Sequence, residues 1–238
     1  MTRRAPRAVR IGLLAAAVLC GQRAKNSARD LFHAEAGLIV TPGSAGRGRF
    51  GGARQSTVAL SLGLKYRLWK VAGSETSDAD PAGPFQPGEQ VRLGVETNDS
   101  GYLYIVHRQP GGSWRRLFPT SEIEGGNHFI RSGVVYPVPP EEGVELQFNG
   151  GPERILLVLA RAPVQHLEAL VGPRQAPGTV SAAPAPELPD SVVESVRKLV
   201  PGKDLLTQRE AGEKSTYVVN RSGKPDSTVL AEVRISSR

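Results

Sequence analysis

Residues 91–107 read VRLGVETNDSGYLYIVH, and this stretch decides the fold class. In 91–97, apolar residues alternate with polar or small ones, which is the period of a half-buried β-strand. Residues 102–107 are apolar on both faces, as expected for a strand in the centre of a sheet. Residues 98–101 (NDSG) are all of types that favour turns. The stretch therefore predicts a β-hairpin whose second strand is central.

Similar short strands recur along the chain between Gly, Pro and Asn residues. We expect them at 58–69, 114–118, 134–138, 144–148, 155–160, 215–220 and 228–235. Many short strands at near-regular spacing indicate an all-β fold, an antiparallel β-sandwich of the immunoglobulin-like or jelly-roll-like kind. Helical spacing predicts two short accessory helices, at 164–171 and 191–199. Ser191 and Glu194 form a capping box for the second.

Composition divides the 238 residues into five segments. Residues 1–20 are a signal peptide or lipoprotein leader, and 21–56 are a flexible basic arm with a short helix near its start. Residues 57–171 form the core of the β-sandwich, and 172–189 are a Pro/Ala-rich linker. Residues 190–238 contain a helix and C-terminal strands. We expect these strands to pack on the sandwich, because an isolated two-stranded hairpin is at best marginal in water.

The leader predicts export. Four arginines within the first ten residues precede the apolar run 11–19, as in a secretory signal. The run is too short to span a bilayer. Cys20, the single cysteine, follows it and is a lipidation candidate, although Leu19 is larger than the residue that usually precedes such a cysteine. The alternative is a cysteine removed with an ordinary signal peptide. We therefore expect a periplasmic, outer-membrane-attached or secreted protein, with a membrane contact only through a lipid anchor.

The positive charge lies mostly outside the presumed domain. The net charge is +7, but the first 54 residues hold ten Lys/Arg and two Asp/Glu, which leaves 20 basic and 21 acidic residues for the remainder. A nucleic-acid-binding domain needs its basic residues on the folded surface. We therefore do not expect nucleic acid as a partner.

The titratable residues form no recognisable catalytic pattern. The four histidines lack the close spacing of a zinc motif, and no nucleophile elbow, P-loop or HExxH sequence occurs. The neighbouring carboxylates Glu122 and Glu124, and Glu141 and Glu142, are typical of solvated loop edges. We expect no metal, no cofactor and no enzymatic activity.

The binding candidates are Trp114, Arg115 and Arg116. They follow the Pro110-Gly111-Gly112 turn, so the turn 109–116 combines backbone mobility with an aromatic side chain and two guanidinium groups. Arg and Trp are enriched at interface hot spots. The alternative interpretation is an ordinary tryptophan near a sheet edge, packed against its neighbours.

Several linked motifs resemble the bacterial domain-of-unknown-function 4384 family over roughly residues 60–165. They are Phe85-x-Pro87-Gly88-Glu89-x-Val91-Arg92-Leu93, then Asn98-Asp99-Ser100-Gly101-Tyr102-Leu103-Tyr104, then Leu117-Phe118-Pro119, then Asn127, Tyr136 and Pro139. The C-terminal Tyr217-Val218-Val219-Asn220 is similar to lone-domain members. The resemblance implies an exported or envelope-associated protein and brings no established catalytic residues. Each motif also has a structural interpretation, such as a positive φ at Gly101 and a turn at Pro87-Gly88.

These observations favour a non-enzymatic binding or assembly module of the bacterial envelope, with an envelope protein or a surface glycan as partner. The alternative is a hydrolase that acts on cell-wall or surface polymer, with a site assembled from separated loops. A cleft holding a histidine with a partnered carboxylate favours the enzyme, whereas an exposed aromatic strip favours binding.

Overall fold

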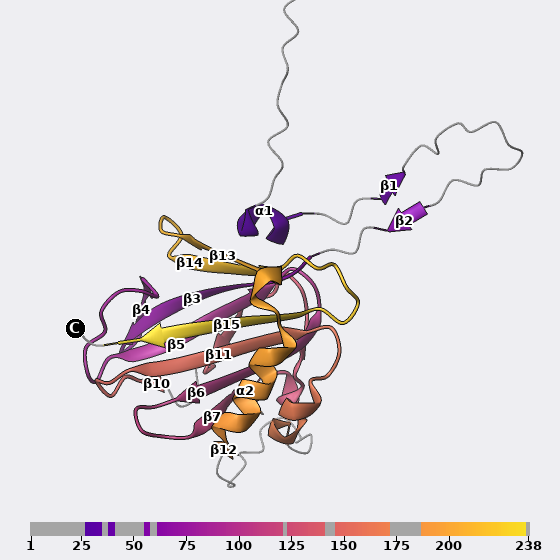
Figure 1. Cartoon of the computed structure of the whole chain (residues 1–238). Helices are drawn as coiled ribbons and strands as arrows, with labels where there is room; N and C mark the ends of the chain where they lie inside the picture. The colour runs from indigo at the N-terminus through magenta and orange to yellow at the C-terminus, as the bar shows by residue number, and fades with distance from the viewer. Residues whose placement is uncertain are drawn as a thin grey trace, which may run out of the picture.

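The computed structural model describes residues 27–34, 38–40, 55–57, 61–120, 123–140, 146–171 and 187–236 (Figure 1). Its strands are β1 (Leu38–Val40), β2 (Gln55–Thr57), β3 (Leu62–Ala72), β4 (Glu75–Ala79), β5 (Gln90–Thr97), β6 (Gly101–Arg108), β7 (Trp114–Phe118), β8 (Phe129–Ile130), β9 (Tyr136–Val138), β10 (Leu146–Gln147), β11 (Glu153–Ala160), β12 (Glu187–Leu188), β13 (Leu205–Glu210), β14 (Ser215–Asn220) and β15 (Thr228–Ile235). Its helices are α1 (Ala28–Phe32) and α2 (Asp190–Leu199), with 3₁₀ turns η1 (Glu124–Gly126), η2 (Gln165–Leu170) and η3 (Gly202–Asp204).

Two antiparallel sheets form the molecule, which confirms the predicted all-β sandwich. The first, which we call sheet B, has seven strands in the order β10-β5-β3-β14-β13, with β4 beside β3 and β9 beside β5. The second, sheet C, has six strands in the order β12-β7-β6-β11-β15, with β8 beside β6. The small β1–β2 ladder is separate. As predicted from its two apolar faces, β6 lies between two neighbours in the middle of sheet C.

The main core lies between the two sheets. It is built from the inward-facing residues of both, including Leu64, Leu68 and Leu93 from sheet B and Leu103 and Leu157 from sheet C, all fully buried. Alternation along β3 and β5 places these side chains on one face. Their burial supplies the main driving force that holds the sheets together.

The predicted hairpin at 91–107 is wrong, because β5 and β6 belong to different sheets. The chain leaves β5 at Thr97 and crosses from sheet B to sheet C. The Asn98 side chain fixes this crossing by accepting a hydrogen bond from the Gly63 amide (2.7 Å) and donating one to the Ser61 carbonyl (2.8 Å). A turn sequence indicates that the chain reverses, and it does not say whether the next strand pairs with the previous one.

Gly101 is required for close packing and not for a positive φ. A Cβ at this position would lie 2.7 Å from the Ala160 carbonyl oxygen of the neighbouring strand β11. Gly88, by contrast, has φ +89° in the turn that precedes β5, as its Pro-Gly sequence predicts.

The C-terminal strands are integral to both sheets. β14 pairs with β3 in sheet B, and β15 pairs with β11 in sheet C over eight residues. Glu187–Leu188, within the expected linker, instead forms β12 and pairs with β7. The C-terminal segment therefore contributes strands to both sheets of the sandwich.

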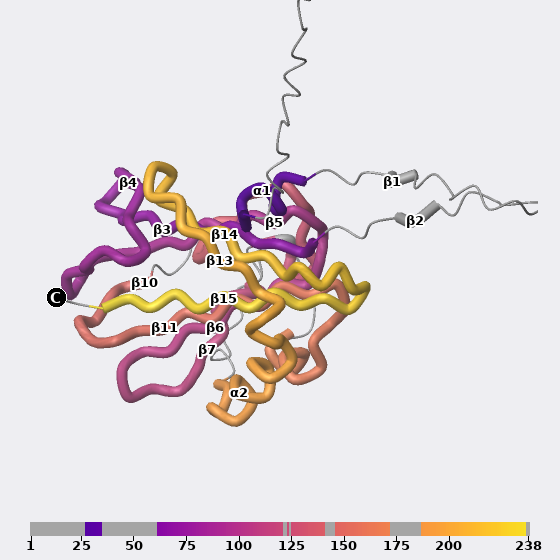
Figure 2. Tube along the Cα trace, turned by 45° about the horizontal axis from the view of Figure 1, so that its top comes forward, coloured from indigo at the N-terminus to yellow at the C-terminus, as the bar shows by residue number. Residues whose placement is uncertain are grey.

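Helices cover the two outer faces unequally. Figure 2 shows α1 and α2 on opposite sides of the two sheets. On sheet C, α2, η2 and β12 bury a second cluster that includes Trp114, Leu156 and Val196. On sheet B, α1 lies within the expected basic arm and buries Ala28 and Phe32.

The expected capping box of α2 is not formed. The N-cap residue is Pro189, without a side-chain hydrogen bond, and the helix already includes Ser191. The buried positions are Val193 and Val196, whereas Leu199 is 49% exposed. Val193 and Val196 pack into the cluster on the outer face of sheet C, so this packing holds a helix that has no side-chain cap.

Candidate functional site

A chain of ring contacts runs from the covered face of sheet C to its rim. Tyr102 and Tyr104 lie on β6, and Phe129 of β8 is directly opposite Tyr102 in the ladder. The ring of His128 lies 5.1 Å from that of Tyr104 and 5.0 Å from that of Tyr102, and the Tyr102 and Phe129 rings are 5.1 Å apart. We call these four residues the aromatic ladder. Such separations are typical of favourable ring contacts.

The inner end of the ladder is a polar cluster at η2. The Tyr104 hydroxyl donates a hydrogen bond to Glu168 and accepts one from the Val164 amide (3.0 Å). Burial, reinforced by the bond to Glu168, raises the pKa of Tyr104, so the hydroxyl stays protonated. His128 Nε2 lies 3.3 Å from the same Glu168 oxygen, within ion-pair distance but not aligned for a hydrogen bond.

The outer end of the ladder is apolar and open to solvent. Phe129 is 41% exposed, and Val134 and Val135 in the following loop are 37% and 40% exposed. The loop is anchored by its backbone: the Arg131 amide donates to the Tyr136 hydroxyl (3.1 Å), and the Gly133 amide donates to the Thr97 carbonyl (2.8 Å). The apolar side chains are thus presented on a fixed loop.

A second histidine–carboxylate pair is closed off from solvent. His107 Nε2 and Glu153 Oε2 are 2.7 Å apart, with side chains 8% and 3% exposed. The other oxygen of Glu153 accepts a hydrogen bond from the Asn149 amide (2.9 Å). Since neither group meets solvent, the pair ties β6 to β11 and offers no surface to a ligand.

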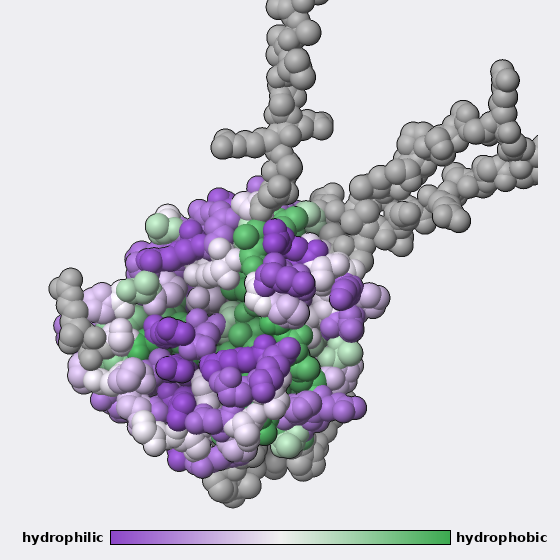
Figure 3. All heavy atoms as spheres, viewed as in Figure 1, coloured by the Kyte–Doolittle hydropathy of each residue, from purple (hydrophilic) through white to green (hydrophobic). Residues whose placement is uncertain are grey.

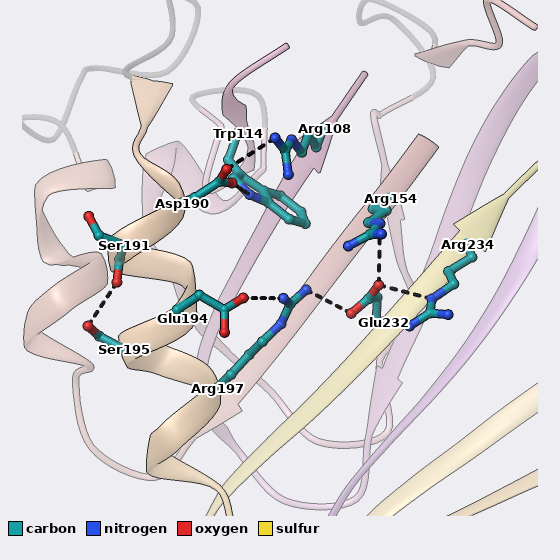
Figure 4. A network of polar contacts seen from close by, with 10 residues as sticks. All are labelled: Arg108, Trp114, Arg154, Asp190, Ser191, Glu194, Ser195, Arg197, Glu232 and Arg234. Carbon is teal, nitrogen blue, oxygen red and sulfur yellow. Dashed lines mark hydrogen bonds and ion pairs between the residues drawn. The ribbon is translucent and has the colours of Figure 1, made fainter. Parts of the chain in front are cut away.

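Trp114 is buried, which corrects the expectation of an exposed platform and agrees with the alternative of a packed tryptophan. Only 1% of it is exposed, because α2 covers it. Its indole Nε1 donates to Asp190 Oδ1 (2.8 Å), and the guanidinium carbons of Arg108 and Arg197 each lie 5.9 Å from the ring centre (Figure 4).

The two arginines that follow Trp114 point to different partners. The Arg115 side chain is 63% exposed and pairs with Glu187 on β12 (3.0 Å). Arg116 donates to the Leu170 carbonyl at the end of η2 (2.6 Å). The turn 109–116 therefore does not gather its aromatic and cationic groups on one exposed surface.

The aromatic ladder was missed because its parts are distant in sequence. The missing information is the pairing of β6 with β8, which brings residues 102 and 129 together. The available signal was the aromatic pair His128-Phe129 beside a turn.

The part of the chain that the structure describes has neither a metal-binding cluster nor a membrane-spanning helix. No group of three or more His, Cys, Asp or Glu side chains there could hold a metal ion. None of the helices described is both long and apolar enough to cross a membrane. The lipidation candidate Cys20, the leader 1–20 and residues 172–186 of the expected linker lie outside the described residues.

Comparison with known proteins finds a family match over part of the chain. Residues 84–163 match the family model described as "Domain of unknown function (DUF4384)", which confirms the resemblance found in the sequence motifs. The match includes β5 to β11 and all four residues of the aromatic ladder, but not Glu168. Neither the curated proteins nor the solved structures contain a match to this chain.

Proposed function

We propose that this chain, which contains a DUF4384 match over residues 84–163, is a non-enzymatic binding or assembly module of the bacterial envelope. Its partner is an envelope protein or a surface glycan. The proposed contact surface is the outer end of the aromatic ladder together with the loop that follows it.

The observation that carries this proposal is the clustering of exposed apolar side chains. Within the described ranges, four large hydrophobic residues are exposed, and three of them, Phe129, Val134 and Val135, lie in one seven-residue segment. Single exposed hydrophobic residues need no explanation, whereas clustered ones are typical of interaction sites. The tilted rings of Tyr102 and His128 extend the same surface inward.

The test is capture of partners from envelope extract by wild type and by Phe129→Ala. Loss of an interface anchor typically costs about 2 kcal/mol or more, which is roughly a thirtyfold loss of affinity. Leu199→Ala is the matched control, because Leu199 is the fourth exposed residue and lies at the end of α2. Equal capture by wild type and Phe129→Ala would remove the ladder as the contact surface.

We also propose export, on the basis of the leader. Intact-mass measurement of protein from the native host should show loss of about the first 20 residues. An additional acyl mass would assign Cys20 as the lipidation site. Recovery of the unprocessed chain from the cytoplasm would contradict export.

The alternative function is a hydrolase acting on cell-wall or surface polymer. Its support is the His128–Glu168 pair, since Glu168 is 39% exposed beside a histidine. A catalytic role predicts turnover of peptidoglycan fragments by wild type that is lost in Glu168→Gln. Turnover of this kind would replace the binding proposal.

A further inference from the structure

Three arginines stand in one row across three neighbouring strands of sheet C. Arg108 on β6 is directly opposite Arg154 on β11, and Arg154 is directly opposite Arg234 on β15. Adjacent strands lie about 4.8 Å apart, so the row places the backbone of one arginine per strand at a regular interval. Trp114 continues the row on β7, opposite Arg108. We call Arg108, Arg154 and Arg234 the arginine row.

Like charges opposite each other in a sheet are unfavourable, and two carboxylates compensate them here. Figure 4 shows Glu232 in contact with both Arg154 and Arg234, and Asp190 in contact with Arg108. Arg234 Nε lies 3.1 Å and Arg154 Nε 3.8 Å from Glu232 Oε1, and Arg108 Nη2 lies 3.1 Å from Asp190 Oδ2.

The compensation is incomplete at the β11–β15 end of the row. Glu232 also accepts a hydrogen bond from Arg197 of α2 (2.8 Å), so three guanidinium groups share one carboxylate. Among the described residues, Arg154 and Arg234 have no other ion-pair partner. Their side chains are 44% and 76% exposed. Each guanidinium has five N–H donors, so most of these donors face solvent.

The surroundings of this end are hydrophilic. Figure 3 shows hydrophilic side chains gathered over β15 and beside α2, next to an apolar band through the middle of the same face. The β11–β15 end of the arginine row, where Arg154 and Arg234 are 44% and 76% exposed, therefore lies on a surface that is open to solvent.

We propose that the arginine row binds an anionic surface polymer with repeating phosphate or carboxylate groups. Guanidinium forks match such oxyanions in bidentate geometry. Because the row has one arginine on each of three adjacent strands, it can contact several successive anionic groups of a linear polymer, whereas an isolated ion would contact only one or two arginines. The inference rests on the proposed binding role, but it uses a surface distinct from the aromatic ladder.

The test measures binding of the full chain to polyphosphate and to polygalacturonate, with neutral dextran as the reference. At least one polyanion should bind above dextran, and affinity should fall with salt because counterions are released. The double variant Arg154→Gln/Arg234→Gln should weaken binding about tenfold or more and reduce the salt slope by about 2. It should remain folded, because Glu232 keeps its bond to Arg197.

Two further variants sharpen the test. Glu232→Gln removes the competing carboxylate and should strengthen polyanion binding. Arg209→Gln is the matched control, since Arg209 is an arginine 41% exposed and ion-paired with Asp80 on the other sheet. It should bind like wild type.

The proposal is overturned if neither polymer binds above dextran, if the double variant binds as wild type does, or if Arg209→Gln loses as much. If polyglutamate binds more strongly than either polymer, the arginine row is a site for acidic protein segments, and the proposal of a surface polymer is overturned. Phe129→Ala should keep polyanion binding, so failure of the ladder in partner capture and failure of the arginine row are distinguishable.

Discussion

The outer faces of the two sheets differ in how much of each is covered, and the two tryptophans show the difference. Trp114 on sheet C lies under α2 and is 1% exposed. Trp69 on the outer face of sheet B is half-buried, with the guanidinium carbon of Arg67 5.8 Å from its ring centre. Over this face, α1 packs only at one end, around Tyr217 and Val219.

The burial of residues along individual strands follows the covering of the outer sheet faces. β6 and β11 of sheet C are buried on nearly every residue, and so is β14 of sheet B, which α1 contacts. β3 instead alternates between buried and half-buried positions from Leu64 to Trp69. A sheet that is covered on both faces needs apolar residues on both, and a sheet with one open face needs them only on the inner one. A strand pattern therefore predicts whether something covers the sheet, but not what covers it.

The largest expected effect is that of Trp114→Ala. Removing a fully buried tryptophan should lower the free energy of unfolding by about 3–5 kcal/mol. For a domain of this size the corresponding fall in Tm is roughly 10 °C. Trp69→Ala should cost about 1 kcal/mol, because part of that ring is already in water. Thermal unfolding of both variants measures the difference.

Arg115→Ala serves as the neighbouring control. The ion pair between Arg115 and Glu187 is exposed, and such pairs contribute at most about 1 kcal/mol. The adjacent residues 114 and 115 should therefore differ strongly in their effect on stability. Equal losses for Trp114→Ala and Trp69→Ala would show that α2 does not protect its face as described.

A smaller effect is expected from two glycines that differ in what lies next to them. At Gly101 an added Cβ would meet the backbone oxygen of Ala160, which cannot move without disturbing β11. Gly101→Ala should therefore destabilise the protein by about 1–3 kcal/mol. At Gly94 the added Cβ would lie 2.4 Å from the far end of the Trp69 ring, which can swing away.

Gly94→Ala should consequently change tryptophan emission more than stability. The emission maximum should move to longer wavelength as the Trp69 ring is displaced into solvent, while Trp114 stays buried. Chemical denaturation combined with fluorescence gives both quantities. A stability loss at Gly94 as large as at Gly101 would mean that the Trp69 ring is fixed in place.

The fold class could be predicted from the sequence, but the pairing of strands could not. Period-two alternation and turn residues located most strands, since both are local properties. The pairing of β6 with β8 and the crossing from β5 to β6 depend on residues far apart, such as Asn98 and Gly63. Trp114 is visible in the sequence, yet its burial depends on α2, which begins 76 residues later.

The arginine row shows the same limit. Arg108, Arg154 and Arg234 are widely separated in sequence, and no local motif links them. They become neighbours only because β6, β11 and β15 are adjacent in sheet C. The overall neutrality of the domain concealed this local excess of positive charge.

The smallest expected effect concerns α1, the only helix on the open face among the described elements. Glu213 joins α1 to sheet B. It accepts a hydrogen bond from the Tyr217 hydroxyl of β14 (2.8 Å) and forms an ion pair with Arg29 of α1 (2.7 Å). The hydrogen bond from Tyr217, together with the charges of Arg29 and Lys65, holds the pKa of Glu213 below its ordinary value of 4.5. A carboxylate with a lowered pKa in the folded state stabilises above its ordinary pKa, and this contribution is lost as the pH falls through the lowered value.

Acidification below about pH 4.5 should therefore loosen α1 before the sandwich unfolds. The measurement is hydrogen exchange of the Leu31 and His33 amides, which donate to Ser27 and Arg29 within α1, corrected for the intrinsic pH dependence of exchange. Glu213→Gln should remove the acid step, because a glutamine does not titrate. An acid step that persists in Glu213→Gln would show that another group ties α1 to the sheet.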